Sequence, residues 1–322
     1  MTTREQLLAV KLAALVRDRD SSWVLQPGDF GGGAALTVRS SAWVLLDDRP
    51  ERGLGAAMAW ALRHEATELN VLAEHGSGVL ARRAAGWAPP VTVWQIAGRD
   101  LRSATPEPLP ATPPLPTAHA EFESLIRDSG AEPIIEHGVL CGEVDGLEVC
   151  RVVTDGHTET VRLEVGVGAH DREAFQTLHG DRPTGEALAD VVRAVREHRT
   201  PGAARHPLNL LAQERALRAR LIAEPHLIGA THVRSVMPPT PRPNVKDAVP
   251  CVAQATIVGH QVTVVCSAGV DLDVVPFAVD AMAACGTADC LVVLPARDAL
   301  DIQHRLAAAA PGSIAITPLS TP

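Results

Sequence analysis

The sequence lacks any segment that could serve as a membrane anchor or a secretory signal. No window reaches the roughly 18 consecutive apolar residues of a membrane span. Charged residues at positions 4, 5, 11 and 17 interrupt the apolar residues at the start of the chain, whereas a secretory signal needs an unbroken apolar core. We therefore expect a cytoplasmic protein that makes no membrane contact.

Motifs for nucleotide binding and for common catalytic machinery are also missing. The sequence has no GxSxG, no HExxH, no Cys–His catalytic signature and no haem motif. Its six cysteines show no CxxC pair and no zinc-finger spacing, which predicts buried, reduced thiols. The three glycines at 31–33 lack the spacing and the lysine of a phosphate-binding loop. The sequence therefore indicates no nucleotide site.

The chain does contain enough apolar sequence for several cores. Its 322 residues are 46% hydrophobic, 21% charged and only 3% aromatic, and the mean hydropathy is +0.07. A disordered chain would be less hydrophobic and more highly charged. This length accommodates two domains or three small ones.

Charge is unevenly distributed along the chain. Residues 118–192 carry a net charge of -11, and residues 193–246, which follow directly, carry +7. We favour mutual neutralisation within one fold, because crowded like charges cost stability unless an opposite surface is near. The alternative is a phosphate-binding surface formed by Arg196, Arg199, Arg215 and Arg218. The basic segment has no aromatic residue to stack on bases, so we favour an unknown protein partner over nucleic acid.

Proline-rich stretches predict the domain boundaries. Residues 103–118, SATPEPLPATPPLPTA, carry six prolines and no periodic apolar residues, which is typical of an extended, semi-rigid linker. We therefore predict an N-terminal module over 1–102, an acidic central module over 119–203 and a C-terminal module over 204–322. A second proline-rich stretch, residues 238–243, interrupts the last module.

Both ends of the chain show the same order of predicted elements, α-β-β-β-α-β-α-β. The predicted class is α/β and α+β, with two similar α/β modules flanking a central α+β module that contains a β-meander. The matched order suggests an internal duplication. The N-terminal helix is predicted from the spacing of Leu8, Leu12, Leu15 and Val16.

A helix, a three-strand meander, a helix and a returning strand also form the order seen in the restriction-endonuclease-like, PD-(D/E)XK superfamily, which each end of the chain resembles over residues 4–97 and 208–318. The active site of that superfamily needs a Glu-x-Lys on the third strand to hold a metal and position water. The third strands here read SAWVLLDD and QVTVVCSA. The resemblance therefore implies degenerate, catalytically silent nuclease-like modules.

The central segment contains a strong hairpin signal. In VLCGEVDGLEVCRVV, Asp145 and Gly146 lie between alternating apolar residues, and Asp-Gly favours a two-residue type I′ turn. Such a turn pairs Val144 with Leu147 and Glu143 with Glu148. Continued without interruption, it also pairs Gly142 with Val149 and Cys141 with Cys150.

Two directly opposed glutamates repel each other unless water, a cation or a shared proton intervenes. If the next strand pairs alongside, Glu164 and His170 join their face. Glu143, Glu148 and Glu164 could then bind Mg²⁺ or Mn²⁺, which prefer oxygen ligands, with His170 as general base. The alternative, which we favour, is a solvated face neutralised by Arg151, Arg162 or Arg172, with no cofactor.

Two functions remain on these grounds. The protein is either a non-catalytic binding or scaffold protein built on silent modules, or a metal-dependent hydrolase or nuclease with its site on the central module. We favour the first, because neither end of the chain has a catalytic motif.

Overall fold

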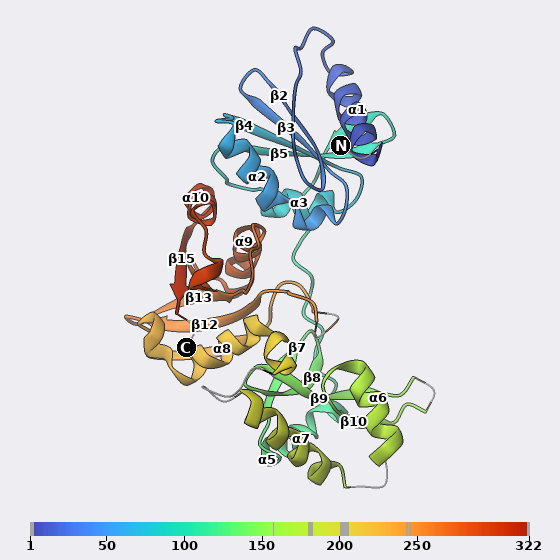
Figure 1. Cartoon of the computed structure of the whole chain (residues 1–322), viewed down its shortest axis with the longest axis vertical. Coiled ribbons are helices and arrows are strands. Elements are labelled where there is room, and N and C mark those ends of the chain that lie inside the picture. The colour runs from blue at the N-terminus through green and yellow to red at the C-terminus, as the bar shows by residue number, and fades with distance from the viewer. Residues whose placement is uncertain are drawn as a thin grey trace. The chain divides into compact units, whose positions relative to one another are not determined.

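The computed structural model describes residues 3–156, 158–179, 183–199, 206–242, 244 and 246–320, without the side chains of 175–179. These residues form three β-sheets, each accompanied by helices (Figure 1). The predicted mixture of α/β and α+β structure is confirmed. In the described part of the chain, no helix combines the length and the apolar character that crossing a membrane requires.

The N-terminal module contains a six-stranded sheet in the order β1-β2-β3-β4-β5-β6. Strands β1 to β3 are antiparallel, β4 and β5 run parallel to β3, and β6 is antiparallel to β5. The elements are α1 (Thr3–Arg17), β1 (Gln26–Gly28), β2 (Gly33–Val38), β3 (Ser41–Leu46), the 3-10 helix η1 (Pro50–Arg52), α2 (Leu54–Arg63), β4 (Glu68–Ala73), α3 (Ser77–Arg83), β5 (Val91–Ala97) and β6 (Asp100–Ser103).

Both faces of this sheet are covered, which explains the nearly continuous apolar sequence of β3 and β4. Helix α1 packs on one face through Leu12, Leu15 and Val16, as the spacing of these residues predicts. Figure 1 shows α2 and α3 on the opposite side of the sheet from α1.

The central module is a four-stranded antiparallel meander in the order β10-β9-β8-β7. Helices α5 and α7 contact the sheet and each other, and their apolar residues complete its core. The elements are α4 (Thr117–Ala120), α5 (Glu123–Asp128), β7 (Glu132–Glu136), β8 (Val139–Val144), β9 (Leu147–Thr154), β10 (Val161–Val165), α6 (Gly168–His179) and α7 (Thr184–Arg199).

The C-terminal module has a five-stranded sheet in the order β11-β12-β13-β14-β15. Its order of helices and strands repeats that of the N-terminal module up to β5, as predicted, and the duplication itself stays a prediction. The elements are η2 (Pro207–Leu210), α8 (Gln213–Ala223), η3 (Pro225–Ile228), β11 (His232–Val236), β12 (Cys251–Ile257), β13 (His260–Cys266), α9 (Val274–Cys285), β14 (Asp289–Pro295), η4 (Ala296–Asp298), α10 (Asp301–Ala309) and β15 (Ser313–Leu319).

Residue contacts divide the chain into two compact units, and the boundary between Leu109 and Pro110 lies within the predicted linker. The first unit contains residues 1–109, 270–292 and 299–316, and the second contains 110–269, 293–298 and 317–322. The first unit thus combines the N-terminal module with α9 and α10, and the second combines the central module with α8 and β11 to β13. The predicted boundary at 203/204 lies outside the described residues.

The proline-rich linker is bound at both of its ends. Residues 104–116 form no helix or strand. Near the start of this stretch, Arg82 donates hydrogen bonds to the carbonyl oxygens of Glu107 and Pro108. Near its end, Pro113 lies close to Gly138. Residues 109–112 lie between these two contacts.

The Asp145-Gly146 turn forms as predicted and lies directly against α8. Both residues have positive φ, 46° and 79°, which suits the Asp-Gly pair. A Cβ atom at Gly146 would overlap the backbone of Arg215. Glycine is therefore required here for two reasons, the left-handed backbone and the close approach of the helix.

We predict that Gly146→Ala destabilises the protein by more than Gly259→Ala does. Both glycines have a φ near 80°, but a Cβ at Gly259 meets nothing within 4 Å. The control measures the cost of the left-handed backbone, about 1 kcal/mol, and Gly146→Ala adds overpacking of about 1–3 kcal/mol. Urea unfolding of both variants measures the difference, and equal losses would refute the close packing of the turn on α8.

Candidate functional site

The two glutamates of the central hairpin face each other as predicted. Glu143 in β8 and Glu148 in β9 are directly paired across the strands. Their exposed fractions are only 5% and 3%, so the predicted solvated face is wrong. A buried pair of carboxylates needs counter-charges inside the protein.

A β-bulge changes the pairing beyond the glutamates. Gly142 faces Cys150 and Cys141 faces Arg151, with Val149 as the extra residue, so the predicted Gly142–Val149 and Cys141–Cys150 pairs are wrong. A Cβ on Gly142 would lie 2.6 Å from the Cys150 Sγ. The bulge brings Cys150 into the core and lets Arg151 reach Glu148 on the same face.

Glu143 is held by two arginines of α8. Arg218 donates from Nη2 to its Oε2 at 3.0 Å, and Arg215 donates from Nη1 to its Oε1. The same arginines bind Glu136 in β7, with Arg218 Nη1 at 2.9 Å from Oε1. Two guanidinium groups and two carboxylates thus form a closed buried cluster, which we call the α8 cluster. The predicted neutralisation of the acidic block by the basic block is confirmed.

Glu148 and Glu164 are held by a second set of arginines. Arg151 binds Glu148 through both carboxylate oxygens at 2.8 Å. Arg172 donates to Glu148 at 2.9 Å and lies 3.5 Å from Glu164, which also accepts a 2.8 Å hydrogen bond from Arg162. The expectation that Arg151, Arg162 or Arg172 supplies the neutralising charge is confirmed for all three.

The arginines lower the pKa of Glu136 and of Glu148 and keep both carboxylates ionised despite their burial. Burial raises the pKa of Glu136, but the charges and hydrogen bonds of Arg215 and Arg218 outweigh it, so the pKa is lowered overall. The pKa of Glu148 is lowered in the same way, with the hydrogen bond from Arg151 as the main favourable contribution. A lowered pKa means stability that is present at neutral pH and lost as the pH falls.

This geometry does not support the predicted metal site. Each carboxylate proposed as a ligand, Glu143, Glu148 or Glu164, is in an arginine ion pair. Among the described residues, no group of three or more His, Cys, Asp and Glu side chains is arranged to hold a metal ion. The proposed base, His170, is exposed in the first turn of α6.

The arginines proposed to bind nucleic acid do not form an open basic surface. Arg215 and Arg218 are 4% and 1% exposed and belong to the α8 cluster. Arg199 donates to the carbonyl oxygens of Asp145, Leu208 and Leu211. Arg196 donates to the carbonyl oxygen of Gly130 at 2.8 Å. The predicted phosphate-binding set is therefore wrong for Arg215 and Arg218, and the other two arginines hold backbone carbonyls together.

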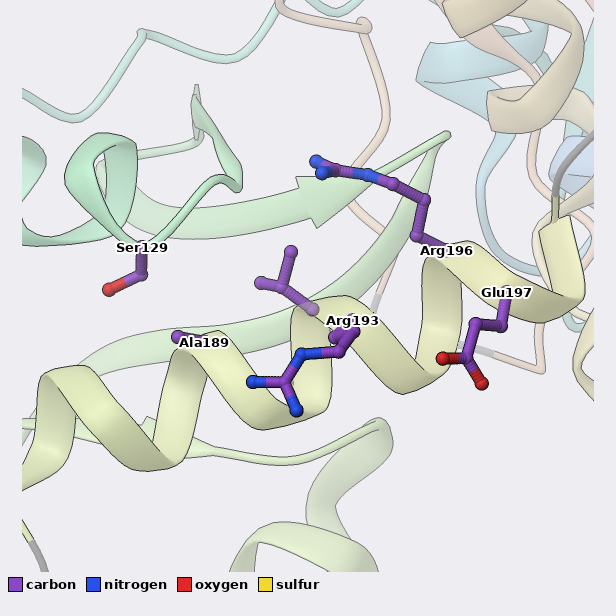
Figure 2. A pocket seen from close by; sticks show the side chains of 6 residues that line it. Ser129, Ala189, Arg193, Arg196 and Glu197 are labelled. Carbon is purple, nitrogen blue, oxygen red and sulfur yellow. The ribbon is translucent and has the colours of Figure 1, made fainter.

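A hollow of about 380 Å³ lies along the surface of α7. Figure 2 shows Arg193 and Arg196 on this helix pointing in different directions, and Ser129, directly after α5, also lines the hollow. Arg193 forms a 2.8 Å ion pair with Asp190, one turn away. The arginines that line the hollow therefore do not converge on one site that could bind an anion.

The first compact unit contains a buried ion cluster that the sequence analysis missed. Arg83 in α3 donates to Asp280 in α9 at 2.7 Å and to Asp273 at 3.3 Å. Asp273 also accepts a 3.0 Å hydrogen bond from the backbone N–H of Gly55. Burial raises the pKa of Asp273 to about 6, although Arg83 opposes this. About 190 residues separate the partners, so no local pattern could indicate the pairing.

We predict that Glu143→Gln lowers the free energy of unfolding by about 3–5 kcal/mol, because it leaves the two buried guanidinium groups of Arg215 and Arg218 with the single carboxylate of Glu136. The matched control is Glu123→Gln, which breaks an exposed ion pair with Arg127 and should cost less than about 0.5 kcal/mol. Urea unfolding at neutral pH measures both. Similar losses in the two variants would contradict the importance of the α8 cluster.

We predict that the stability difference between the wild type and Asp273→Asn depends on pH. The folded-state pKa of Asp273 is raised to about 6 from an ordinary pKa of 3.8. Its contribution to the free energy of unfolding is therefore fully present below pH 3.8 and is lost as the pH rises through about 6. Between pH 4 and 7 the wild type should lose on the order of 3 kcal/mol relative to the variant. Urea unfolding across this range tests it, and a difference independent of pH would show that Asp273 titrates normally.

Comparison of the chain with protein-family models, with curated proteins and with solved structures gives no match. The resemblance to the restriction-endonuclease-like superfamily therefore stays a prediction, and the functional argument depends on the geometry described above.

Proposed function

We propose that the protein is a non-catalytic binding or scaffold protein, built on two degenerate nuclease-like modules that flank an acidic central module. The observation that supports this proposal is the state of the three candidate metal ligands. Glu143, Glu148 and Glu164 all bind arginines within the second compact unit, and these bonds connect separate elements of the fold.

The ion pairs give the carboxylates a structural role. Arg215 and Arg218 connect α8 to β7 and β8, and Arg172 connects α6 to β9 and β10. A metal ion would have to displace these guanidinium groups from a buried site. Removing one partner of a buried ion pair costs about 3–5 kcal/mol, so metal binding would compete directly with folding.

The third strands of the terminal modules also support the proposal. The structure has β3 and β13 as the third strand of each meander, at the segments where the resemblance requires a Glu-x-Lys. Neither strand contains that motif. Asp47, which directly follows β3, pairs with Arg4 of α1.

Exposed apolar side chains on α1 favour a protein partner. Leu7 and Val10 lie one helical turn apart and are 65% and 68% exposed. Contiguous exposed apolar patches mark protein–protein interaction sites, and these two side chains would contribute to one. In this proposal, the N-terminal module presents an apolar surface and the charged residues hold the modules together.

Calorimetric titration with Mg²⁺ and Mn²⁺ tests this function against the metal-dependent hydrolase. We expect no heat of binding and no change in thermal stability for the wild type, because arginines already neutralise the carboxylates. Glu143→Gln and Glu123→Gln serve as site and surface variants. If the wild type and Glu123→Gln bind the metal ion and Glu143→Gln does not, the metal site exists and the proposal is wrong.

A further inference from the structure

The helices of the two terminal modules contact each other reciprocally within the first compact unit. In each module, one helix follows the three-strand meander, α2 or α9, and a second helix follows the next strand, α3 or α10. Helix α2 contacts α9 and α10, and α3 contacts α9. The first helices therefore meet each other, and each of them meets the second helix of the other module. Reciprocal contacts of this kind characterise an isologous interface between two like partners.

Polar contacts follow the same reciprocal pattern. Arg82 and Arg83 at the end of α3 bind Asp280 in α9. In the other direction, Arg305 in α10 donates to the carbonyl oxygen of Leu62 in α2 at 3.0 Å. The second helix of each module thus uses an arginine to hold the first helix of the other.

The segments that follow the second helices also meet. The backbone N–H of Ala88, after α3, donates to the carbonyl oxygen of Ala309, at the end of α10, at 2.9 Å. Gly86 lies close to Pro311. Corresponding regions of two like modules that face each other are expected beside a two-fold axis.

The interface is symmetric in its helices but not in its charges. The N-terminal side supplies Arg82 and Arg83, and the C-terminal side supplies Asp273 and Asp280. Arg82 binds both carboxylate oxygens of Asp280, at 2.9 and 3.0 Å, and Asp280 is 1% exposed. On the other side of the axis, Arg305 donates to a backbone carbonyl oxygen. Two N-terminal surfaces placed together would bring Arg82 and Arg83 to the interface without Asp273 and Asp280.

We propose that the chain is a covalently linked pseudo-dimer, in which α2 and α3 form a docking surface whose occupant is a C-terminal module of this protein, presenting α9 and α10. The charge asymmetry makes this surface specific for the unlike module, because buried arginines need buried carboxylates opposite them. The inference is independent of the proposed function, since it involves neither Glu143 nor any metal.

Two full-length variants with opposite charge reversals test the proposal. The first carries Arg82→Glu and Arg83→Glu, and the second carries Asp280→Arg. Each variant alone faces like charges within its own chain, so its terminal modules should separate while the protein keeps the mass of the wild type. In an equimolar mixture, complementary charges are available only between chains. We expect a complex of twice the 34.0 kDa chain mass in size-exclusion chromatography with light scattering.

Three controls make the outcome decisive. A variant with all three reversals restores complementarity within one chain and should have the mass of the wild type. Arg99→Glu, at an 87% exposed side chain that pairs with Asp18, should behave like the wild type alone and in mixtures. Circular dichroism checks folding, and if a reversal prevents folding, the neutral set Arg82→Gln with Arg83→Gln and Asp280→Asn repeats the mixing. A mixture with the mass of single chains, or dimers formed by either variant alone, would overturn the proposal.

Discussion

The contact of α8 with the central hairpin is the interaction on which the second compact unit depends. Helix α8 packs on β11, β12 and β13, and the thiol of Cys251 in β12 donates to the carbonyl oxygen of Glu214 in α8. The same helix directs Arg215 and Arg218 to the carboxylates of β7 and β8. Because each of these charged groups has two partners, the burial of any one is favourable only while the others are in place.

Arginine suits both ion clusters for a geometric reason. A planar guanidinium with five donors can bind two carboxylates at once, whereas the ammonium of lysine is a point charge on a flexible stem. Arg218 bridges Glu136 and Glu143, and Arg83 bridges Asp273 and Asp280. The chain has only two lysines, Lys11 and Lys246, among its 29 basic residues. In the folded protein, the two bridging arginines join segments that lie far apart in the sequence.

Local features of the fold were predictable from the sequence, because neighbouring residues determine them. The Asp145-Gly146 turn sets the pairing of Glu143 with Glu148, and the apolar spacing of α1 identifies its buried face. The bulge beside Gly142 was not predictable, since it depends on Cys150 and on Ile126 of α5. The element order of the two terminal modules was also visible in the sequence, although the duplication and the nuclease-like resemblance stay predictions.

The binding partners of the charged side chains could be predicted only in general terms. Adjacent blocks of opposite charge indicate neutralisation, but they do not identify which arginine meets which carboxylate. The partners in the α8 cluster are separated by 72–82 residues, and no spacing rule connects them. The pairing of α3 with α9 is harder still, because the separation is 190–198 residues and the charges are isolated in the sequence.

Charge counted along the sequence therefore overstates the charge available to a partner. In the basic segment, Arg215, Arg218 and Arg242 are buried beside glutamates, and Arg199 binds backbone carbonyls. Long-range attraction of an acidic ligand depends on uncompensated surface charge, which these arginines do not supply. In the proposed binding function, recognition of a partner would therefore depend more on shape and on exposed apolar residues such as Leu7 and Val10 than on the net charge of +7 that first suggested a phosphate-binding surface.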